Sequence, residues 1–156
     1  MLKSDEIFSL IKADHHKVEG LFSKIEKTGE RAAKRRDNLY SDLRNDLNLH
    51  MEAEEKAVYP LLKRNEATQS IGYEGVEEHE IVKFLLQKLD GTSSDSKEWI
   101  AQITALKEVI QHHVKEEENE MFKKMKRAFT DEELQIMAQD FQREKEKPSL
   151  RRVEAA

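Results

Sequence analysis

The fold is decided by the stretch HMEAEEKAVYP, residues 50–60. His50 and Glu54 are four residues apart, so a helix places them on one face, about one turn from each other. Apolar residues continue this face before and after the pair, which is the pattern of a helix packed against a core. A second stretch, HHVKEEENEMF at residues 112–122, repeats the arrangement 63 positions later. Each stretch therefore predicts a core-facing helix with a histidine and a glutamate in its apolar seam.

The sequences that precede these two stretches also repeat. ADHHKVEGLF at residues 13–22 aligns with EEHEIVKFLL at residues 77–86, at an offset of 64. Each half of the chain thus contains two amphipathic segments, which predicts two helical hairpins of the same design. Joined by a loop at Asn65–Gly75, they form an all-α, up-down-up-down four-helix bundle with a pseudo-two-fold axis. Pro60 is expected to kink or end the second helix near its last turn.

A further short segment follows the bundle, which we assign to residues 1–128. Thr130 and Glu133 have the spacing of a capping box, and the apolar residues after them share one helical face. We expect Pro148 to end this helix and the last residues to fray, so that residues 129–156 form a C-terminal helix and a tail. The sequence leaves open whether this helix covers the bundle or mediates dimers.

Composition favours helices and excludes several classes of protein. Charged residues make up 38% of the chain and hydrophobic residues 37%, as expected for apolar stripes on solvated helices. The absence of cysteine excludes disulfides, thiolate nucleophiles and cysteine-held iron–sulfur clusters. The net charge of −5 mixes both signs, so neither a nucleic-acid groove nor a polybasic membrane patch is expected. There is no apolar run of roughly 18 residues and no secretory signal, so we expect a soluble cytoplasmic protein.

Each of the four predicted helices interrupts its apolar seam with one histidine, and the second and fourth add a glutamate one turn later. One seam histidine by itself is more often a hydrogen-bonded core residue than a ligand. Six polar groups in one layer are different, because a buried unpaired carboxylate costs several kcal/mol in a domain stable by only about 5–15 kcal/mol. A metal removes this difficulty, since it binds neutral imidazole and ionised carboxylate together. The candidate metal ligands are His15, His50, Glu54, His79, His113 and Glu117.

The geometry of the hairpins allows these six side chains to surround two ions. Antiparallel folding brings the two seam histidines of each hairpin to the same height, and one carboxylate from each of two helices can then bridge the ions. Six nitrogen and oxygen ligands without sulfur fit iron best, because a structural zinc takes four ligands and calcium or magnesium takes oxygen throughout. We therefore expect two non-haem iron ions as the cofactor, with manganese as the less favoured alternative.

At these residues the chain resembles the hemerythrin family, and in particular its bacterial hemerythrin-like (HHE cation-binding) branch. The resemblance rests on the ordered set H…HxxxE…H…HxxxE and covers roughly residues 5–127. It implies that the four seam histidines are terminal iron ligands and that Glu54 and Glu117 bridge the irons. A ferritin-like site is not expected, since no histidine has a glutamate three residues before it. The matching pieces are ADHHKVEGLF, LHMEAEEKAVYPLL, EEHEIVKFLLQKL and HHVKEEENEMF.

One residue departs from the pattern of the oxygen-carrying hemerythrins. They have a further histidine one turn after the first on the third helix, where this chain has Lys83. The resemblance thus implies two histidines for each iron and a coordination site that is open or filled by water. Lys83 could pair with Glu19, its counterpart in the repeat, or both could extend to solvent. Other neighbours of the seam are expected to be solvated, with contact to a ligand imidazole as the alternative; they are His16, Glu55, His112, Glu116 and Glu118.

The predicted site is that of a protein that binds or senses a small diatomic ligand, O2 or NO, or that handles iron. The alternatives are an enzyme that reduces NO or disproportionates peroxide, and an interaction bundle with a vestigial site. The sequence does not rank O2 above NO, and it identifies no protein partner and no oligomeric state.

Overall fold

The computed structural model describes residues 3–147 of the 156-residue chain, and these residues form helices and short turns without a strand. Within this part of the chain, none of the helices combines the length and the apolar character that crossing a membrane requires. The elements are α1 (Glu6–Glu26), α2 (Ala33–Ala57), α3 (Tyr59–Arg64), α4 (Gln69–Asp90), α5 (Lys97–Glu116), the π-helical turn η1 (Glu117–Met121), α6 (Phe122–Ala128) and α7 (Asp131–Glu146).

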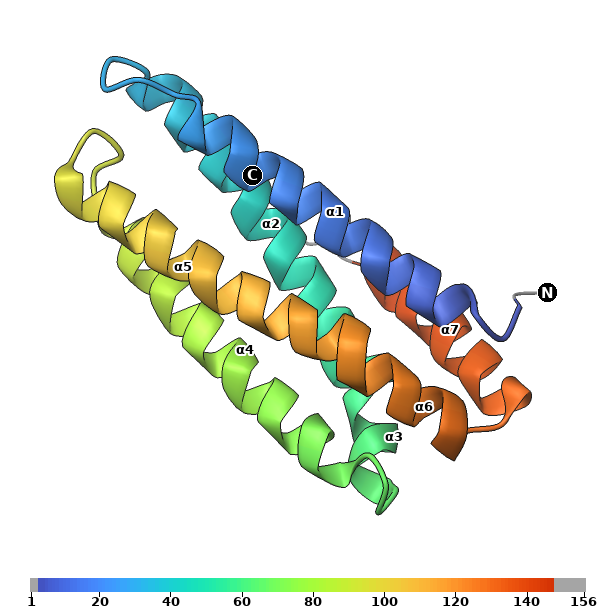
Figure 1. The fold of residues 1–156 in the computed structure, drawn as a ribbon. Coiled ribbons are helices and arrows are strands. Elements are labelled where there is room, and N and C mark those ends of the chain that lie inside the picture. The colour runs from blue at the N-terminus through green and yellow to red at the C-terminus, as the bar shows by residue number, and fades with distance from the viewer. Residues whose placement is uncertain (1–2, 148–156) are drawn as a thin grey trace.

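Two helical hairpins make up the bundle, as the sequence predicts (Figure 1). α1 packs along α2, and α4 packs along α5. α5 continues through η1 into α6, so these three elements together form one long helical rod. The predicted all-α four-helix bundle with an additional C-terminal helix is confirmed.

The second long helix is interrupted at Val58, where α2 ends and α3 begins. Pro60 lies in the first turn of α3, where a missing N–H costs no helical hydrogen bond. In an uninterrupted helix its ring would clash with the carbonyl of Lys56. The expected kink is confirmed. Tyr59, the first residue after the break, is almost fully buried, with 1% of its surface exposed.

The loop expected at Asn65–Gly75 is shorter in the structure, because α4 already begins at Gln69. The predicted loop was therefore too long. The two glycines of this segment each weaken a helix by roughly 0.5–1 kcal/mol, but their packing favours the helix. Gly72 and Gly75 are buried where α4 packs on α3. A Cβ on Gly75 would lie only 2.7 Å from Cζ of Tyr59. The close approach of the two helices thus requires glycine here and outweighs helix propensity.

A polar layer divides the interior of the bundle into two apolar clusters. One cluster contains the residues of α1 that precede His15, together with residues of α3, α6 and α7. The other contains the residues of α1 that follow His15, together with residues of α2, α4 and α5. Burial of these two clusters stabilises the bundle, and the seam histidines lie where the clusters meet.

The C-terminal helix α7 lies against α2 and α1, so it covers the first hairpin (Figure 1). Thr130 and Glu133 form the predicted capping box at its start. The ring of Phe141 is 6.0 Å from that of His50 and nearly perpendicular to it, so α7 reaches the polar layer. Pro148, expected to end this helix, and the tail expected to fray lie outside the described residues. The buried face of α7 is the predicted one, with Leu134, Met137, Ala138 and Phe141.

Candidate metal centre

The structure brings together all six side chains that the sequence predicts as metal ligands. They come from five elements, and each is at most 7% exposed. Their positions follow from the seam pattern, because each lies on the face of its helix that points into the bundle. Metal ligation by these residues remains a prediction. They are His15 on α1, His50 and Glu54 on α2, His79 on α4, His113 on α5 and Glu117 on η1.

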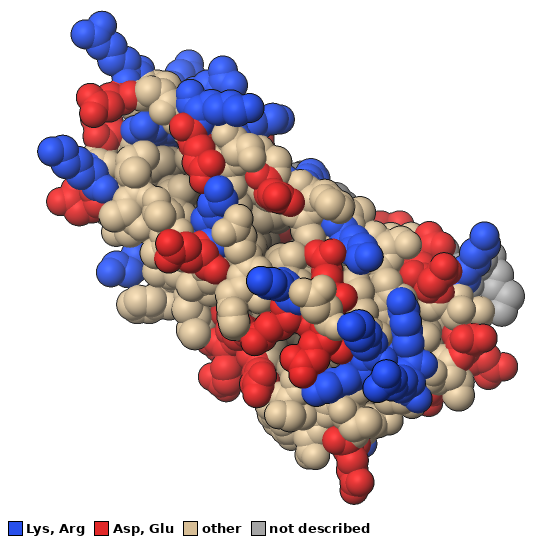
Figure 2. Space-filling view, viewed as in Figure 1, with Lys and Arg blue, Asp and Glu red and all other residues tan. Residues whose placement is uncertain are grey.

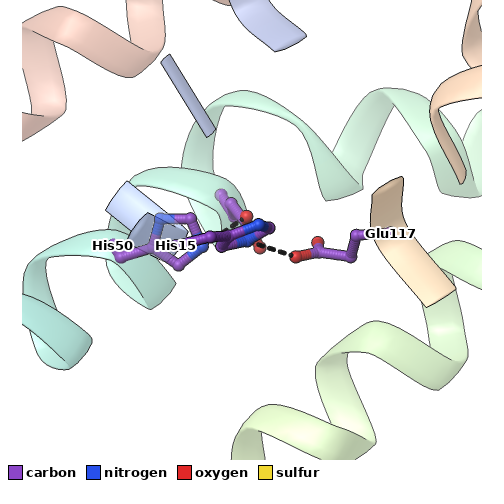
Figure 3. A group of neighbouring side chains, drawn as sticks. His15, His50 and Glu117 are labelled. Atoms are coloured by element: carbon purple, nitrogen blue, oxygen red, sulfur yellow. Dashed lines mark hydrogen bonds and ion pairs between the residues drawn. The ribbon is translucent and has the colours of Figure 1, made fainter. Parts of the chain in front are cut away.

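Four of these side chains form a first group of potential ligands. His15, His50, Glu54 and Glu117 each offer one atom, and these atoms all lie within 4.8 Å of one another. Nε2 of His50 is 2.7 Å from Glu54 Oε1, and Nε2 of His15 is 3.1 Å from Glu117 Oε1 (Figure 3). One cation between these atoms would contact both histidines of the first hairpin and one oxygen of each glutamate.

The second group joins the histidines of the other hairpin to the same glutamates. Nε2 of His79 and Nε2 of His113 are 3.2 Å apart. Glu54 Oε2 lies 3.3 Å from His79 Nε2, and Glu117 Oε1 lies 3.2 Å from His113 Nε2. Each carboxylate therefore contacts one histidine from each hairpin, which is the arrangement that a bridging carboxylate needs.

Several buried polar atoms in this layer lack a hydrogen-bond partner, as expected of atoms that contact bound cations. His50 Nε2 and both carboxylate oxygens of Glu54 are buried without a hydrogen-bond partner of acceptable geometry, although His50 and Glu54 lie 2.7 Å apart. Such atoms are costly unless a cation contacts them. Among residues 3–147, six carboxylates and two lysines belong to the layer and the contacts around it. The four negative charges that remain would be balanced by two divalent ions.

A carboxylate also lies beside the outward-facing nitrogen, Nδ1, of every seam histidine. A carboxylate can only accept a hydrogen bond, so at His15, His50 and His113 it holds the proton on Nδ1 and leaves Nε2 to face the centre of the layer. At His79 the carboxylate lies close to Nδ1 without a hydrogen bond of acceptable geometry. This arrangement orients imidazoles for metal binding. The distances are 2.9 Å for His15 and Glu118, 2.8 Å for His50 and Asp14, 2.9 Å for His113 and Glu78, and 3.4 Å for His79 and Glu55.

The sequence left the roles of Glu55 and Glu118 open, and the structure places both at the imidazole of a seam histidine. Asp14 and Glu78 were missed. Their signal lies in the repeat, because each directly precedes a seam histidine at the same offset of 64. Each of these carboxylates contacts a histidine of another helix, which sequence proximity does not reveal. Asp14 reaches α2 and Glu78 reaches α5.

The carboxylates draw protons onto the imidazoles. Burial by itself lowers the pKa of His50, but the charge of Glu54 and the hydrogen bond to Asp14 raise it to about 10. Burial and the charge of Glu54 raise the pKa of Glu117, whereas His113 lowers it, and the balance brings it to about 2. A divalent cation would replace the imidazole protons, because it requires neutral imidazole and ionised carboxylate.

Tyr59 is a potential ligand that the sequence did not indicate. Its hydroxyl donates a hydrogen bond to Glu117 Oε2 at 3.0 Å and lies 3.3 Å and 3.4 Å from Nε2 of His79 and His113. It therefore shares the second group with them. Burial and the charges of Glu117 and Glu54 raise the pKa of Tyr59 well above its ordinary value. The sequence contained one signal for this role. In the repeat, Tyr59 aligns with Phe122, and the two side chains differ by one hydroxyl group.

The proposed pair of Lys83 and Glu19 is not formed, so that prediction was wrong. Nζ of Lys83 lies 2.8 Å from Glu55 and 3.3 Å from Glu80, and Glu19 is exposed on the other hairpin. The reason is that Glu55, one residue after Glu54, lies on the side of α2 that faces α4. Lys83 thereby supports the carboxylate that contacts His79.

Two connected spaces reach the layer between α1 and α5. A groove of about 300 Å³ opens at the surface and ends at His15. A cavity of about 20 Å³ lies behind it and contacts all four seam histidines. The walls that the two share are His15 and the apolar side chains Val18, Ile110 and Val114. The lining that borders the inner cavity is therefore largely apolar, whereas the outer wall of the groove carries charged side chains such as Glu19 and Lys107.

Both glutamate-bearing helices depart from regular α-geometry directly after their glutamate. α2 ends three residues after Glu54, and the helix of α5 becomes the π-helical turn η1 at Glu117 itself. π-Helical turns are rare in proteins, and those that occur are often found at functional sites.

Comparison with known proteins places the chain in a family of cation-binding domains. The family model described as "Hemerythrin HHE cation binding domain" matches residues 6–125. An uncharacterised hemerythrin-like protein of Schizosaccharomyces pombe is 28% identical over 145 residues, covering 91% of this chain and 68% of that protein. A protein of Nostoc sp. named "DNA nickase" is 26% identical over 141 residues, covering 90% of this chain but only 39% of that protein.

A solved structure has the same fold. It is the crystal structure of a hemerythrin HHE cation-binding domain-containing protein from Mycobacterium kansasii, a homolog of Rv2633c. It matches with a TM-score of 0.77 at 24% identity and covers 96% of this chain and 91% of that one.

Proposed function

Because the chain belongs to the hemerythrin HHE cation-binding domain family, we propose that it is a non-haem di-iron protein that binds or senses a small diatomic ligand, O2 or NO, or handles iron. His15 and His50 would hold one iron, and His79 and His113 the other. Glu54 and Glu117 would bridge them, and Tyr59 is a further donor for the second iron. The irons would supply redox chemistry and an exchangeable coordination position.

The observation that carries this proposal is the shared use of the two glutamates. Each carboxylate contacts a histidine of both hairpins, so the layer contains two groups of donors that share a glutamate. A mixed set of imidazole and carboxylate is suited to iron, and the absence of sulfur argues against copper(I) or an iron–sulfur cluster. Manganese is the less favoured alternative.

The approach to the two groups differs, which supports ligand exchange at the first. The hydroxyl of Tyr59 lies at His79 and His113. The groove between α1 and α5 reaches His15 instead, and the apolar side chains that it shares with the inner cavity suit a small uncharged molecule. We therefore assign ligand exchange to the position held by His15 and His50.

A di-iron enzyme that acts on NO or peroxide is the second candidate. The observation in its favour is Tyr59, whose hydroxyl donates to Glu117 within the layer and could exchange a proton there. An interaction bundle with a vestigial site is the third. DNA cleavage is not proposed, because the match covers only 39% of the Nostoc protein named for it.

The test is the metal content and the absorption spectrum of the purified protein, before and after exposure to air, azide and NO. We expect two irons per chain and spectral changes with O2 or NO. His50→Ala should lose iron, whereas His16→Ala, the matched change at an exposed neighbour of His15, should retain it. Multiple turnovers of NO or peroxide in stopped-flow measurements would favour the enzyme. A protein without metal after growth in iron-rich medium would contradict all the iron functions.

A further inference from the structure

A third group of metal-ligand type lies outside the polar layer, on the surface of the second hairpin. His112 and Glu116 are one turn apart on α5, and Glu78 faces them from α4. Nε2 of His112 is 3.0 Å from Glu116 Oε1 and 3.8 Å from Glu78 Oε2. The His112 side chain is 67% exposed, so a hydrated ion can reach this group from solvent.

The α4 carboxylate of the surface group, Glu78, has different partners from its counterpart in the first hairpin. Asp14 is the counterpart of Glu78 in the repeat, and each contacts a seam histidine through Nδ1. Asp14 also receives Lys145 of α7, with Nζ at 2.7 Å. Within the described chain, the ion pairs of Glu78 are with His112 and His113 instead. In the first half a lysine of α7 thus lies beside the orienting carboxylate, whereas in the second half two side chains of metal-ligand type lie near it.

The residues that distinguish the halves are those of the surface group. At the offset of 63, His112 and Glu116 correspond to Leu49 and Ala53, neither of which binds a metal. α7 packs on the first hairpin, and no described element covers this side of the second. The extra donors therefore occur only on the half that is open to solvent.

Acidic side chains lie around the surface group. Figure 2 shows acidic side chains gathered over the middle of α4 and α5. An acidic surface of this kind concentrates cations and accelerates their arrival.

We propose that Glu78, His112 and Glu116 form a surface site for a divalent transition-metal ion, from which iron is loaded into the position of His79 and His113. One imidazole and two carboxylates suit Fe2+, Mn2+ or Zn2+, with water completing the coordination. Glu78 connects the two places, since its Oε1 contacts His113 and its Oε2 faces His112. The loading role rests on the proposed function, whereas the binding of a third ion does not.

The first experiment counts ions. Protein loaded with iron is analysed for metal and then titrated calorimetrically with Zn2+. The iron content tests the proposed function, and one additional Zn2+ per chain tests the surface site. His112→Ala and Glu116→Gln should abolish the additional equivalent, and His16→Ala should keep it. The absence of a third equivalent, or its persistence in both variants, would mean that His112 only forms ion pairs with the glutamates, and would overturn the site.

The second experiment measures loading. Metal-free protein is mixed with Fe2+ without oxygen, and bound iron is followed by rapid chelator quench. His112→Ala should take up iron about 10-fold more slowly, because loss of a contact at a metal site lowers its affinity by about 10-fold or more, and it should reach the iron content of the wild type. His16→Ala should load at the wild-type rate. Equal rates for His112→Ala and the wild type would overturn the loading role even if a third ion binds.

Discussion

At the scale of single residues, the candidate centre depends on carboxylates outside the six predicted ligands. Each seam histidine has a carboxylate at Nδ1, and two of these carboxylates also contact a lysine, Lys145 at Asp14 and Lys83 at Glu55. These contacts orient the imidazoles before an ion arrives. Their effect should therefore appear in metal affinity more than in folding.

We predict that Glu118→Gln weakens iron binding without unfolding the protein. The carboxylate contacts Nδ1 of His15 at 2.9 Å, and loss of such a contact lowers metal affinity by about 10- to 100-fold. Competition with a chelator of known affinity measures the effect. Glu120→Gln is the matched control, since Glu120 lies two residues away and pairs with the half-buried Lys124 rather than with a seam histidine. Equal affinities of the two variants would show that Glu118 is an ordinary surface residue.

At the scale of elements, the break between α2 and α3 and the glycines of α4 act together. Pro60 ends α2, α3 packs on α4, and Tyr59 passes over Gly75 into the polar layer. The hydroxyl then lies among Glu117, His79 and His113. The position of this hydroxyl thus depends on a helix contact rather than on local sequence.

We predict that Gly75→Ala displaces Tyr59 and changes the centre. The added Cβ would lie 2.7 Å from Cζ and 2.8 Å from the hydroxyl oxygen of Tyr59, and such overpacking costs about 1–3 kcal/mol. The absorption spectrum of the iron-loaded variant should shift toward that of Tyr59→Phe. Gly20→Ala is the control: nothing lies within 4 Å of its Cβ, and it should stabilise α1 by about 0.5–1 kcal/mol. If Gly75→Ala has the same absorption spectrum and the same stability as Gly20→Ala, this contact does not hold Tyr59 in place.

At the scale of the whole molecule, a charged layer separates two apolar clusters. Both hairpins contribute residues to each cluster. The layer between the clusters contains buried carboxylates, and the carboxylates in and around it outnumber the lysines that contact them. The stability of the bundle should therefore depend on what neutralises the layer, which is either protons or metal ions.

We predict that removal of metal lowers the melting temperature strongly. Metal bound only to the native state at a thousand times its dissociation constant stabilises by about 4 kcal/mol, and a domain of this size loses about 2–4 °C per kcal/mol. Calorimetry before and after chelation should therefore show a decrease of about 10 °C, reversed when iron is restored. An unchanged melting temperature after verified removal would favour the vestigial site.

The metal-free protein should be most stable in mildly acid solution. The folded pKa of His50 is raised to about 10, so its stabilising effect is complete below the unfolded pKa of about 6.5 and is lost as pH rises toward 10. The folded pKa of Glu117 is lowered to about 2, so its effect is present above about 4.5 and is lost as pH falls toward 2.

Thermal melts of the metal-free protein between about pH 4 and pH 9 test this dependence, because this range lies within the folded pKa values of Glu117 and His50. The metal-free protein should lose stability from about pH 6.5 upward, while the increment from bound metal should grow, because imidazoles must lose protons to bind it. A metal-free protein that is as stable at pH 9 as at pH 6 would contradict the protonated layer.

The amino-acid sequence by itself determines the helices, their pairing as two repeated hairpins, and the six polar side chains in the core-facing seams. These features follow from residue spacing on single helices, which is a local property. The tertiary structure decides which side chains meet across helices: Tyr59 with the second histidine pair, Asp14 with His50, Lys83 with Glu55 rather than Glu19, and α7 with the first hairpin. These contacts depend on the crossing and register of helices far apart in the chain, which close packing of the whole bundle sets and no local pattern encodes.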